Sequence, residues 1–145
     1  MLLGTCNAKF APGHRVAVPA IFRKDLGEKF IIARWYEDCL VLVAKETWNA
    51  LLKRIIGTEQ MIVTPVRNSE HFLYTSAFEV TPDDQGRIVI PEKLVLFANL
   101  GEEICFLGIG DRAEIWDKNI WDLKEKEVQR DAPKYIEELA NKNAK

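Results

Sequence analysis

Two arginines lie in the same local pattern at two places in this sequence. Arg15 falls in residues 14–19 (His-Arg-Val-Ala-Val-Pro) and Arg87 in residues 86–91 (Gly-Arg-Ile-Val-Ile-Pro), 72 positions further on. A guanidinium makes paired hydrogen bonds to a phosphate or to the major-groove edge of guanine. The spacing predicts a duplicated unit that displays one arginine in each copy, and the chemistry of the guanidinium makes both arginines candidates for DNA contact. A lone surface arginine is more often part of a salt bridge, and Asp83 is a possible partner.

Other polar residues near the two arginines could widen such a patch. These are Lys9, His14, Arg23 and Lys24 around Arg15, and Gln85 in the turn before Arg87. Basic side chains contact phosphates, and a glutamine can reach a base edge. Each of these residues also fits the role of an ordinary solvated surface residue, so both alternatives stay open.

Other chemistries find little support. Asp83 and Asp84 are adjacent, so their side chains point to different sides, and no histidine or further carboxylate converges on them. We therefore expect a turn-capping role for Asp83. The three cysteines form no Cys-x-x-Cys pair, which predicts small core residues and neither a disulfide nor a metal site. Without a nucleophile–base pair or a phosphate-binding glycine loop, we expect no enzyme and no cofactor.

Composition indicates a soluble globular protein. The chain has 145 residues, of which 48% are hydrophobic and 29% charged. No apolar run approaches the roughly 20 residues of a membrane helix, so we expect a cytosolic protein with no membrane partner. The net charge of −2 is uneven, with +4 in residues 1–34 and −5 in residues 67–114. A polyanion would therefore meet a focused basic patch rather than a basic coat.

The elements that would position the arginines recur in the same order. In the first copy we predict a strand at 3–10, a type II turn at Pro12-Gly13, a return strand at 15–18, a short helix at 20–26 and a hairpin of 30–33 with 39–43. In the second copy the equivalents are 77–81, 83–86, 87–90, 91–99, and 104–109 with 113–116. Alternation along the return strands points each arginine away from the core. Helices are predicted at 45–56 and 67–74, and a helical tail from Lys118 is broken at Ala132-Pro133.

Further motifs accompany the repeat. They are Met1-Leu2-Leu3-Gly4, the two Arg-x-x-x-Pro strands, Asp83-x-x-x-Arg87, Cys39-Leu40-Val41 ahead of Trp48, and Glu114-Ile115-Trp116. Together, over residues 1 to about 125, they resemble the MraZ family of bacterial transcriptional regulators. A lone Asp-x-x-x-Arg is uninformative, whereas its repeated context in the right order is specific.

The resemblance implies a mixed α+β fold. It comprises two tandem swapped-hairpin β-α-β units, akin to AbrB-type DNA-binding domains, in a pseudo-symmetric β-barrel-like module with linking and C-terminal helices. The implied divisions are a first repeat with its following helix (1–57), a linking helix (58–74), a second repeat (75–121) and a C-terminal helical tail (122–145).

The resemblance also implies a function. Members look like ring-shaped homo-oligomers that bind repeated promoter elements of double-stranded DNA upstream of the division and cell-wall gene cluster, which predicts a repressor that works at the nucleoid and takes no small-molecule substrate. The DNA-contacting arginines map to Arg15 and Arg87, and Asp83 would orient Arg87. The first repeat departs from the family, because Ala11 matches Asp83 and His14 matches Gly86. The alternative is therefore a structural or protein-interaction oligomer that has lost DNA binding.

Overall fold

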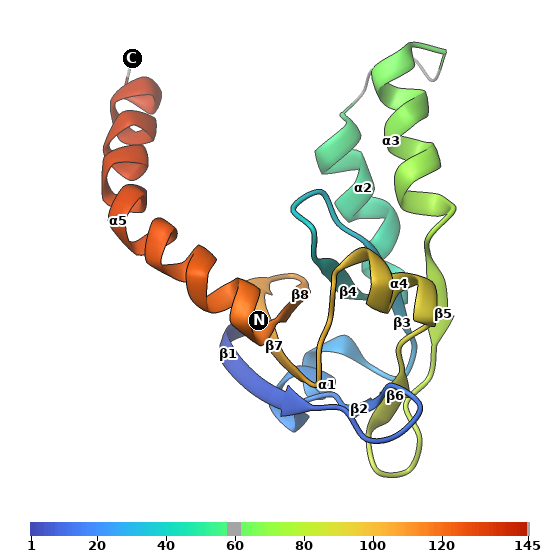
Figure 1. Cartoon of the computed structure of the whole chain (residues 1–145). Helices are drawn as coiled ribbons and strands as arrows, with labels where there is room; N and C mark the ends of the chain where they lie inside the picture. The colour runs from blue at the N-terminus through green and yellow to red at the C-terminus, as the bar shows by residue number, and fades with distance from the viewer. Residues whose placement is uncertain (58–61, 145) are drawn as a thin grey trace.

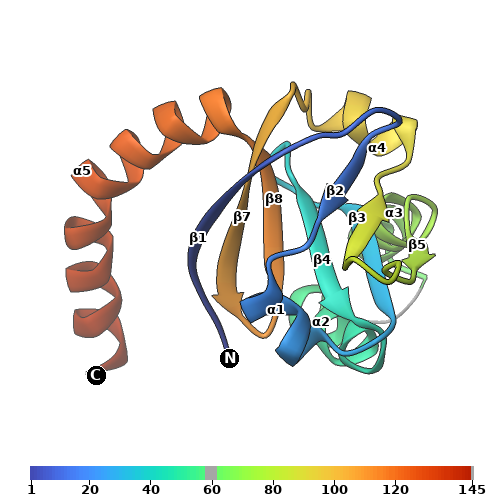
Figure 2. The same cartoon turned by 90° about the horizontal axis from the view of Figure 1, so that it is seen from below.

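Two antiparallel sheets form the body of the computed structural model, which describes residues 1–57 and 62–144. The larger sheet has the order β1-β7-β8-β4-β3-β5, and β2 pairs with β6 in a separate ribbon (Figures 1 and 2). The strands are β1 (Leu2–Lys9), β2 (Arg15–Ala17), β3 (Phe30–Arg34), β4 (Leu40–Ala44), β5 (Phe78–Val80), β6 (Arg87–Val89), β7 (Glu103–Gly110) and β8 (Ala113–Asp117). The chain is thus a mixed α+β protein, as predicted.

Short helices follow the two arginine strands, and longer ones follow the hairpins. They are α1 (Ala20–Leu26), the 3₁₀ turn η1 (Lys45–Thr47), α2 (Trp48–Ile56), α3 (Thr64–Tyr74), α4 (Glu92–Phe97) and α5 (Lys118–Asn143). Pro19 and Pro91 directly precede α1 and α4, where a proline's fixed φ suits a helix start. Residues 58–61 of the predicted linking helix lie outside the described residues.

Strands of one repeat pair with strands of the other. β1 pairs with β7, β5 with β3, and β2 with β6. The predicted hairpins β3–β4 and β7–β8 are confirmed, and β4 and β8 pair with each other between them. The equivalent strands of the two repeats are β1 and β5, β3 and β7, and β4 and β8. If each strand is replaced by its equivalent and the order of the larger sheet is read from the other end, the same order results.

The strands predicted at 3–10 and 15–18 do not pair with each other beyond the turn between them. Apart from one isolated bridge between Ala11 and Arg15, β1 and β2 take their partners from the second repeat. A lone two-stranded hairpin is only marginally stable in water. Pairing across the repeats instead lets Val16 and Ile88 share a single core.

The central strands of the larger sheet are buried on both faces, whereas its edge strands β1 and β5 are largely exposed. Leu40 and Leu42 of β4 pack in a cluster with α1, α4 and the inner side of the ribbon. Val41 and Val43 pack on the opposite side, with residues of α2 and α3. This explains the uninterrupted apolar run of β4. Cys39 and Cys105 are buried in the second cluster and Cys6 is partly buried against the first, which confirms the core reading.

The C-terminal helix is continuous where a break was predicted. α5 begins at Lys118 and is capped by Asp117, whose carboxylate accepts a hydrogen bond from the Ile120 amide at 3.1 Å, and the helix continues through Pro133. A proline inside a helix removes one backbone hydrogen bond and can bend the helix without ending it; Figure 2 shows that α5 is curved. Across residues 1–57 and 62–144, no helix, α5 included, is both long and apolar enough to cross a membrane.

Candidate nucleic-acid interface

The β2–β6 ribbon has one buried face and one exposed face. Its register places Val16 opposite Ile88, and both side chains are only 2% exposed because they point into the core. Side chains alternate along a strand, so the flanking positions point outward. These positions are Arg15 and Ala17 on β2, and Arg87 and Val89 on β6. The outward direction predicted for the two arginines is confirmed.

Arg15 and Arg87 occupy diagonal positions on this outer face. Arg15 is opposite Val89, which is two residues from Arg87. Diagonal neighbours on one face of an antiparallel pair lie about 7–8 Å apart. The fold therefore brings together on one small surface two residues that are far apart in the sequence.

The second turn holds Arg87 through Asp83. One carboxylate oxygen, Oδ1, accepts hydrogen bonds from the amides of Arg87 and Gln85, each at 2.9 Å. The other, Oδ2, accepts from Arg87 Nε at 3.0 Å. Hydrogen bonds from the Arg87 and Gln85 amides and from the Arg87 side chain lower the pKa of Asp83. Asp83 therefore stays ionised at neutral pH and fixes both the backbone and the side chain of Arg87.

The first turn has the same span but no such acceptor. The Ala11 amide donates to the Arg15 carbonyl at 2.8 Å, just as the Asp83 amide donates to the Arg87 carbonyl at 2.9 Å. The Arg15 amide, however, finds only the Ala11 carbonyl, at 3.4 Å. Within residues 1–57 and 62–144, no carboxylate forms an ion pair with Arg15. Arg15, with Ala11 in the place of an aspartate, thus has fewer fixed contacts than Arg87 in the described residues.

His14 takes the place of Gly86 in the backbone as well as in the sequence. Both residues have positive φ, 54° for His14 and 75° for Gly86. Gly13, at φ 81°, also adopts the left-handed conformation expected in a turn of this type. The His14 ring packs edge-on against Phe10 with 5.3 Å between centroids, and its carbonyl accepts from the Ile90 amide at 3.0 Å. This histidine is therefore partly engaged in shaping the turn.

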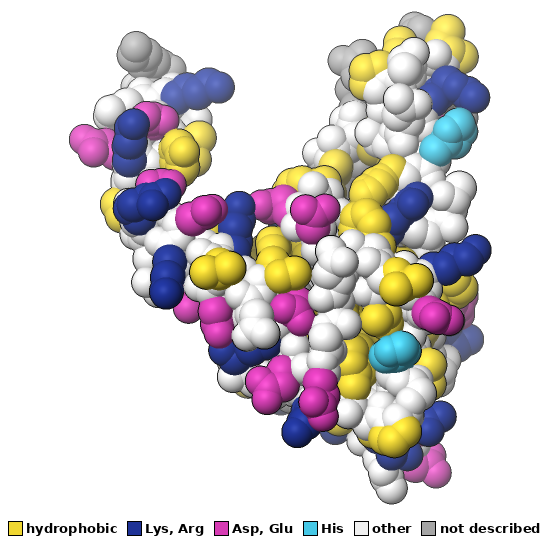
Figure 3. Space-filling view, in the orientation of Figure 1, with side chains coloured by type: hydrophobic (Ala, Val, Ile, Leu, Met, Phe, Trp, Pro, Cys, Tyr) yellow, Lys and Arg dark blue, Asp and Glu magenta, His cyan; other side chains and the backbone are white. Residues whose placement is uncertain are grey.

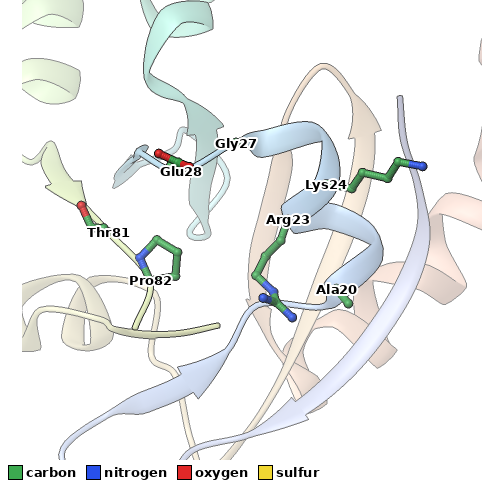
Figure 4. Close-up of a pocket in the computed structure, with 7 residues that line it drawn as sticks. All are labelled: Ala20, Arg23, Lys24, Gly27, Glu28, Thr81 and Pro82. Carbon is green, nitrogen blue, oxygen red and sulfur yellow. The ribbon is translucent and has the colours of Figure 1, made fainter. Parts of the chain in front are cut away.

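The remaining predicted residues occupy different positions around the ribbon. Lys9 lies at the end of β1, 3.5 Å from Glu102, in an exposed ion pair. The side chain of Gln85 is at the exposed tip of the second turn. Arg23 and Lys24 are on α1 and line a cleft with the segment before the second turn; Figure 4 shows that their side chains run in different directions. Lys24 is exposed, whereas Arg23 is partly buried.

Two residues of the outer face were missed at the sequence level. Ala17 and Val89 lie beside the arginines, and Val89 is 46% exposed. Apolar side chains are not usual candidates for DNA contact, although the alternation that assigned the arginines to the outside also placed these residues there. Such side chains can contact the methyl group of thymine.

The outer face of the ribbon carries side chains that can bind a DNA duplex. The major groove admits a two-stranded ribbon, and the arginines can bind guanine edges or phosphates. In Figure 3 the lower end of the molecule, where Figure 1 places β2 and β6, carries several Lys and Arg side chains interspersed with Asp and Glu. The described residues contain no cluster of His, Cys, Asp and Glu that could hold a metal ion.

Known proteins resemble the chain along nearly its full length. Residues 73–141 match the family model described as "MraZ protein, putative antitoxin-like". A protein of Bifidobacterium longum named "Transcriptional regulator MraZ" is 35% identical, over 88% of this chain and 85% of its own. Proteins of the same name from Caldanaerobacter subterraneus subsp. tengcongensis and Clostridium tetani are each 31% identical. Their alignments cover 99% of both chains for the former, and 98% of this chain and 96% of its relative for the latter. These names describe regulators and not enzymes, in agreement with the expectation from the sequence. The chain belongs to the MraZ family.

Proposed function

We propose that this chain is a sequence-specific DNA-binding transcriptional regulator that inserts the outer face of the β2–β6 ribbon into the major groove. The observation that carries the proposal is the shared exposed face of Arg15 and Arg87, with Arg87 already oriented by Asp83. A guanidinium fixed before binding loses less freedom in the complex. Arg87 is therefore the main base-reading residue, and the less constrained Arg15 supports it.

One ribbon makes few contacts, so a single protomer binds weakly and with strong salt dependence. We propose that a ring-shaped homo-oligomer engages repeated promoter elements, because linked sites raise avidity by ~10²–10⁴ without new contacts. The regulated genes are the division and cell-wall cluster, the effect is repression, and the protein acts in the cytoplasm at the nucleoid. The names of the relatives support a regulator, and these finer assignments extend the family resemblance.

The pairing of strands across the repeats supports a further assignment. Exchange of β1 and β5 between the two repeats is the pairing that two interlocked swapped-hairpin units would produce. In this arrangement the two halves cannot separate without breaking both ladders. The ribbon that carries the arginines is then the junction between the units.

Binding to a promoter fragment tests the proposal. The probes are a fragment from upstream of the protein's own gene and a scrambled fragment of equal composition, titrated with wild type, Arg87→Ala and Lys126→Ala. Lys126 is an exposed cation on α5, which stands away from the ribbon in Figure 1, so its variant controls for the loss of one charge. We expect a preference for the promoter fragment that Arg87→Ala abolishes and Lys126→Ala retains. Equal binding of both fragments by wild type would instead favour the interaction oligomer that has lost DNA recognition.

A further inference from the structure

The side chain of Arg23 crosses from the first repeat to the turn of the second. Its Nε donates to the Val18 carbonyl at 3.1 Å, and its guanidinium lies beside the Cα of Gly86. A Cβ at position 86 would lie 2.4 Å from Arg23 Cζ and 2.5 Å from Nη1. The guanidinium thus fills the space that any other residue at position 86 would need.

Gly86 is the residue of the second turn that has a positive φ. Its φ of 75° is a conformation that residues with a side chain rarely adopt, and it is buried although the rest of the turn is exposed. Its amide donates to the Asp83 carbonyl at 2.9 Å, and its carbonyl accepts from the Val18 amide at 3.0 Å. The Val18 amide therefore donates to the turn, and the Val18 carbonyl accepts from Arg23. These hydrogen bonds connect α1, the end of β2 and the turn.

The two turns differ in this support as well. The residue of the second repeat equivalent to Arg23 is Val95, which is buried in the core and has no group that could hold the first turn in this way. The turn that carries Arg87 is therefore held by two side chains. Asp83 holds it from within the turn, and Arg23 contacts it from the other repeat.

We infer that Arg23 is a positioning residue for the DNA-binding turn at 83–87, acting through Gly86 rather than as a phosphate contact. This inference rests on the proposed function. It assigns α1 of the first repeat a role in the recognition made by the second repeat, so that recognition requires both halves of the chain. Lys24, its neighbour on the same helix, points elsewhere and takes no part in this contact (Figure 4).

Salt-dependent DNA binding separates positioning from phosphate contact. Arg23→Ala should weaken binding to the promoter fragment about 2- to 12-fold, the range for one lost hydrogen bond, and leave the slope of log K against log salt unchanged. Arg23→Lys should not restore the affinity, because lysine lacks both the Nε donor and the flat guanidinium. Lys126→Ala, on α5 away from the ribbon, is the control for the loss of one charge. A slope reduced by about 0.9 per contact in Arg23→Ala, with full rescue by lysine, would identify a phosphate contact and overturn the inference.

Hydrogen exchange without DNA tests the same contact independently of the proposed function. The amides of residues 85–87, which are bonded to Asp83, should exchange faster in Arg23→Ala and at the wild-type rate in Lys24→Ala. Arg23→Gln serves as a second variant if Arg23→Ala is too unstable to study. Unchanged exchange at 85–87 in both variants would overturn the inference. If exchange rises as expected while wild type fails to prefer its promoter, the positioning contact stands and the DNA-binding proposal falls.

A double-mutant cycle adds a third readout. Gly86→Ala introduces a Cβ into the space of the guanidinium and displaces it. Arg23→Ala should then have a smaller effect on exchange of the turn in the Gly86→Ala background than in wild type. Additive effects would mean that Arg23 and Gly86 act independently, which contradicts the inference.

Discussion

Introducing a carboxylate into the first turn should strengthen DNA binding. In the second turn the Arg87 amide bonds to the Asp83 carboxylate at 2.9 Å, whereas in the first the Arg15 amide has only the Ala11 carbonyl at 3.4 Å. The backbone bonds that close the two turns nevertheless agree to 0.1 Å, 2.8 Å against 2.9 Å. The substitution Ala11→Asp therefore aims a carboxylate at the Arg15 amide and guanidinium, as Asp83 is aimed at Arg87.

The size of the gain follows from the freedom that Arg15 loses on binding. Immobilising one long side chain in an interface costs about 0.5–1.5 kcal/mol. Orienting Arg15 in the free protein removes up to that amount, which corresponds to an affinity gain of about 2- to 12-fold per engaged protomer. Asp83→Ala should produce a converse loss, because it removes from Arg87 the carboxylate acceptor that Arg15 also lacks.

Fluorescence anisotropy with a labelled promoter fragment measures both changes. Ala11→Asn controls for added negative charge, because its side-chain oxygen can accept the same backbone bond without a charge. Ala11→Asp in an Arg15→Ala background controls for effects that do not involve Arg15 and should show no gain. The reasoning would be refuted if Ala11→Asp left affinity unchanged or lowered it while Arg15→Ala weakened binding, because Arg15 would then contact DNA without benefit from orientation.

Three further predictions concern the rest of the fold. Burial raises the pKa of Glu114 above its usual 4.5, so the stability that its protonated form contributes is present at low pH and is lost as pH rises through the raised value. Glu114→Gln, which still accepts the hydrogen bond from Trp116, should therefore reduce the fall in urea-unfolding stability as pH rises above 4.5, and an unchanged pH profile would contradict this. Burial also raises the thiol pKa of Cys39 and Cys105, so iodoacetamide should label these cysteines only after unfolding. Rapid labelling of Cys39 in the native protein would contradict this. Arg34 on β3 donates two hydrogen bonds to one carbonyl of α3, at 2.6 and 3.0 Å. Arg34→Ala should therefore lower the free energy of unfolding, measured in urea, by about 1.5–3 kcal/mol. A loss below about 0.5 kcal/mol would show that these hydrogen bonds contribute little to stability.

Local patterns in the sequence predicted the elements but not their partners. The alternation around Arg15 and Arg87 reports which way a side chain points, and the positions of Pro19 and Pro91 mark helix starts, so both features could be predicted. The pairing of β1 with β7 depends on which distant strand buries the apolar face best. That is a property of the whole core and has no local sequence signal.

In the candidate site, too, contacts between near neighbours in the sequence could be predicted, and contacts between distant residues could not. Asp83 holds Arg87 within a five-residue turn, so the ion pair joins near neighbours in the sequence, and its orienting role could be expected once the repeated motif was recognised. The contact of Arg23 with Gly86 joins residues 63 positions apart in different repeats, and at the sequence level Arg23 was only a basic neighbour of Arg15. Pro133 was expected to break the helix because a local rule disfavours it there. The continuous α5 shows that a bend can accommodate the proline instead.

Methylation protection tests the central claim most directly. Dimethyl sulfate methylates guanine N7 in the major groove and adenine N3 in the minor groove, so it reports which groove the ribbon enters. On the repeated elements of the promoter fragment, wild type should protect guanine N7. Arg87→Ala, at a concentration that restores occupancy, should lose that protection at one guanine position in each element while Lys126→Ala keeps it. Protection confined to adenine N3, or guanine protection identical in wild type and Arg87→Ala, would contradict recognition of the major groove by this ribbon.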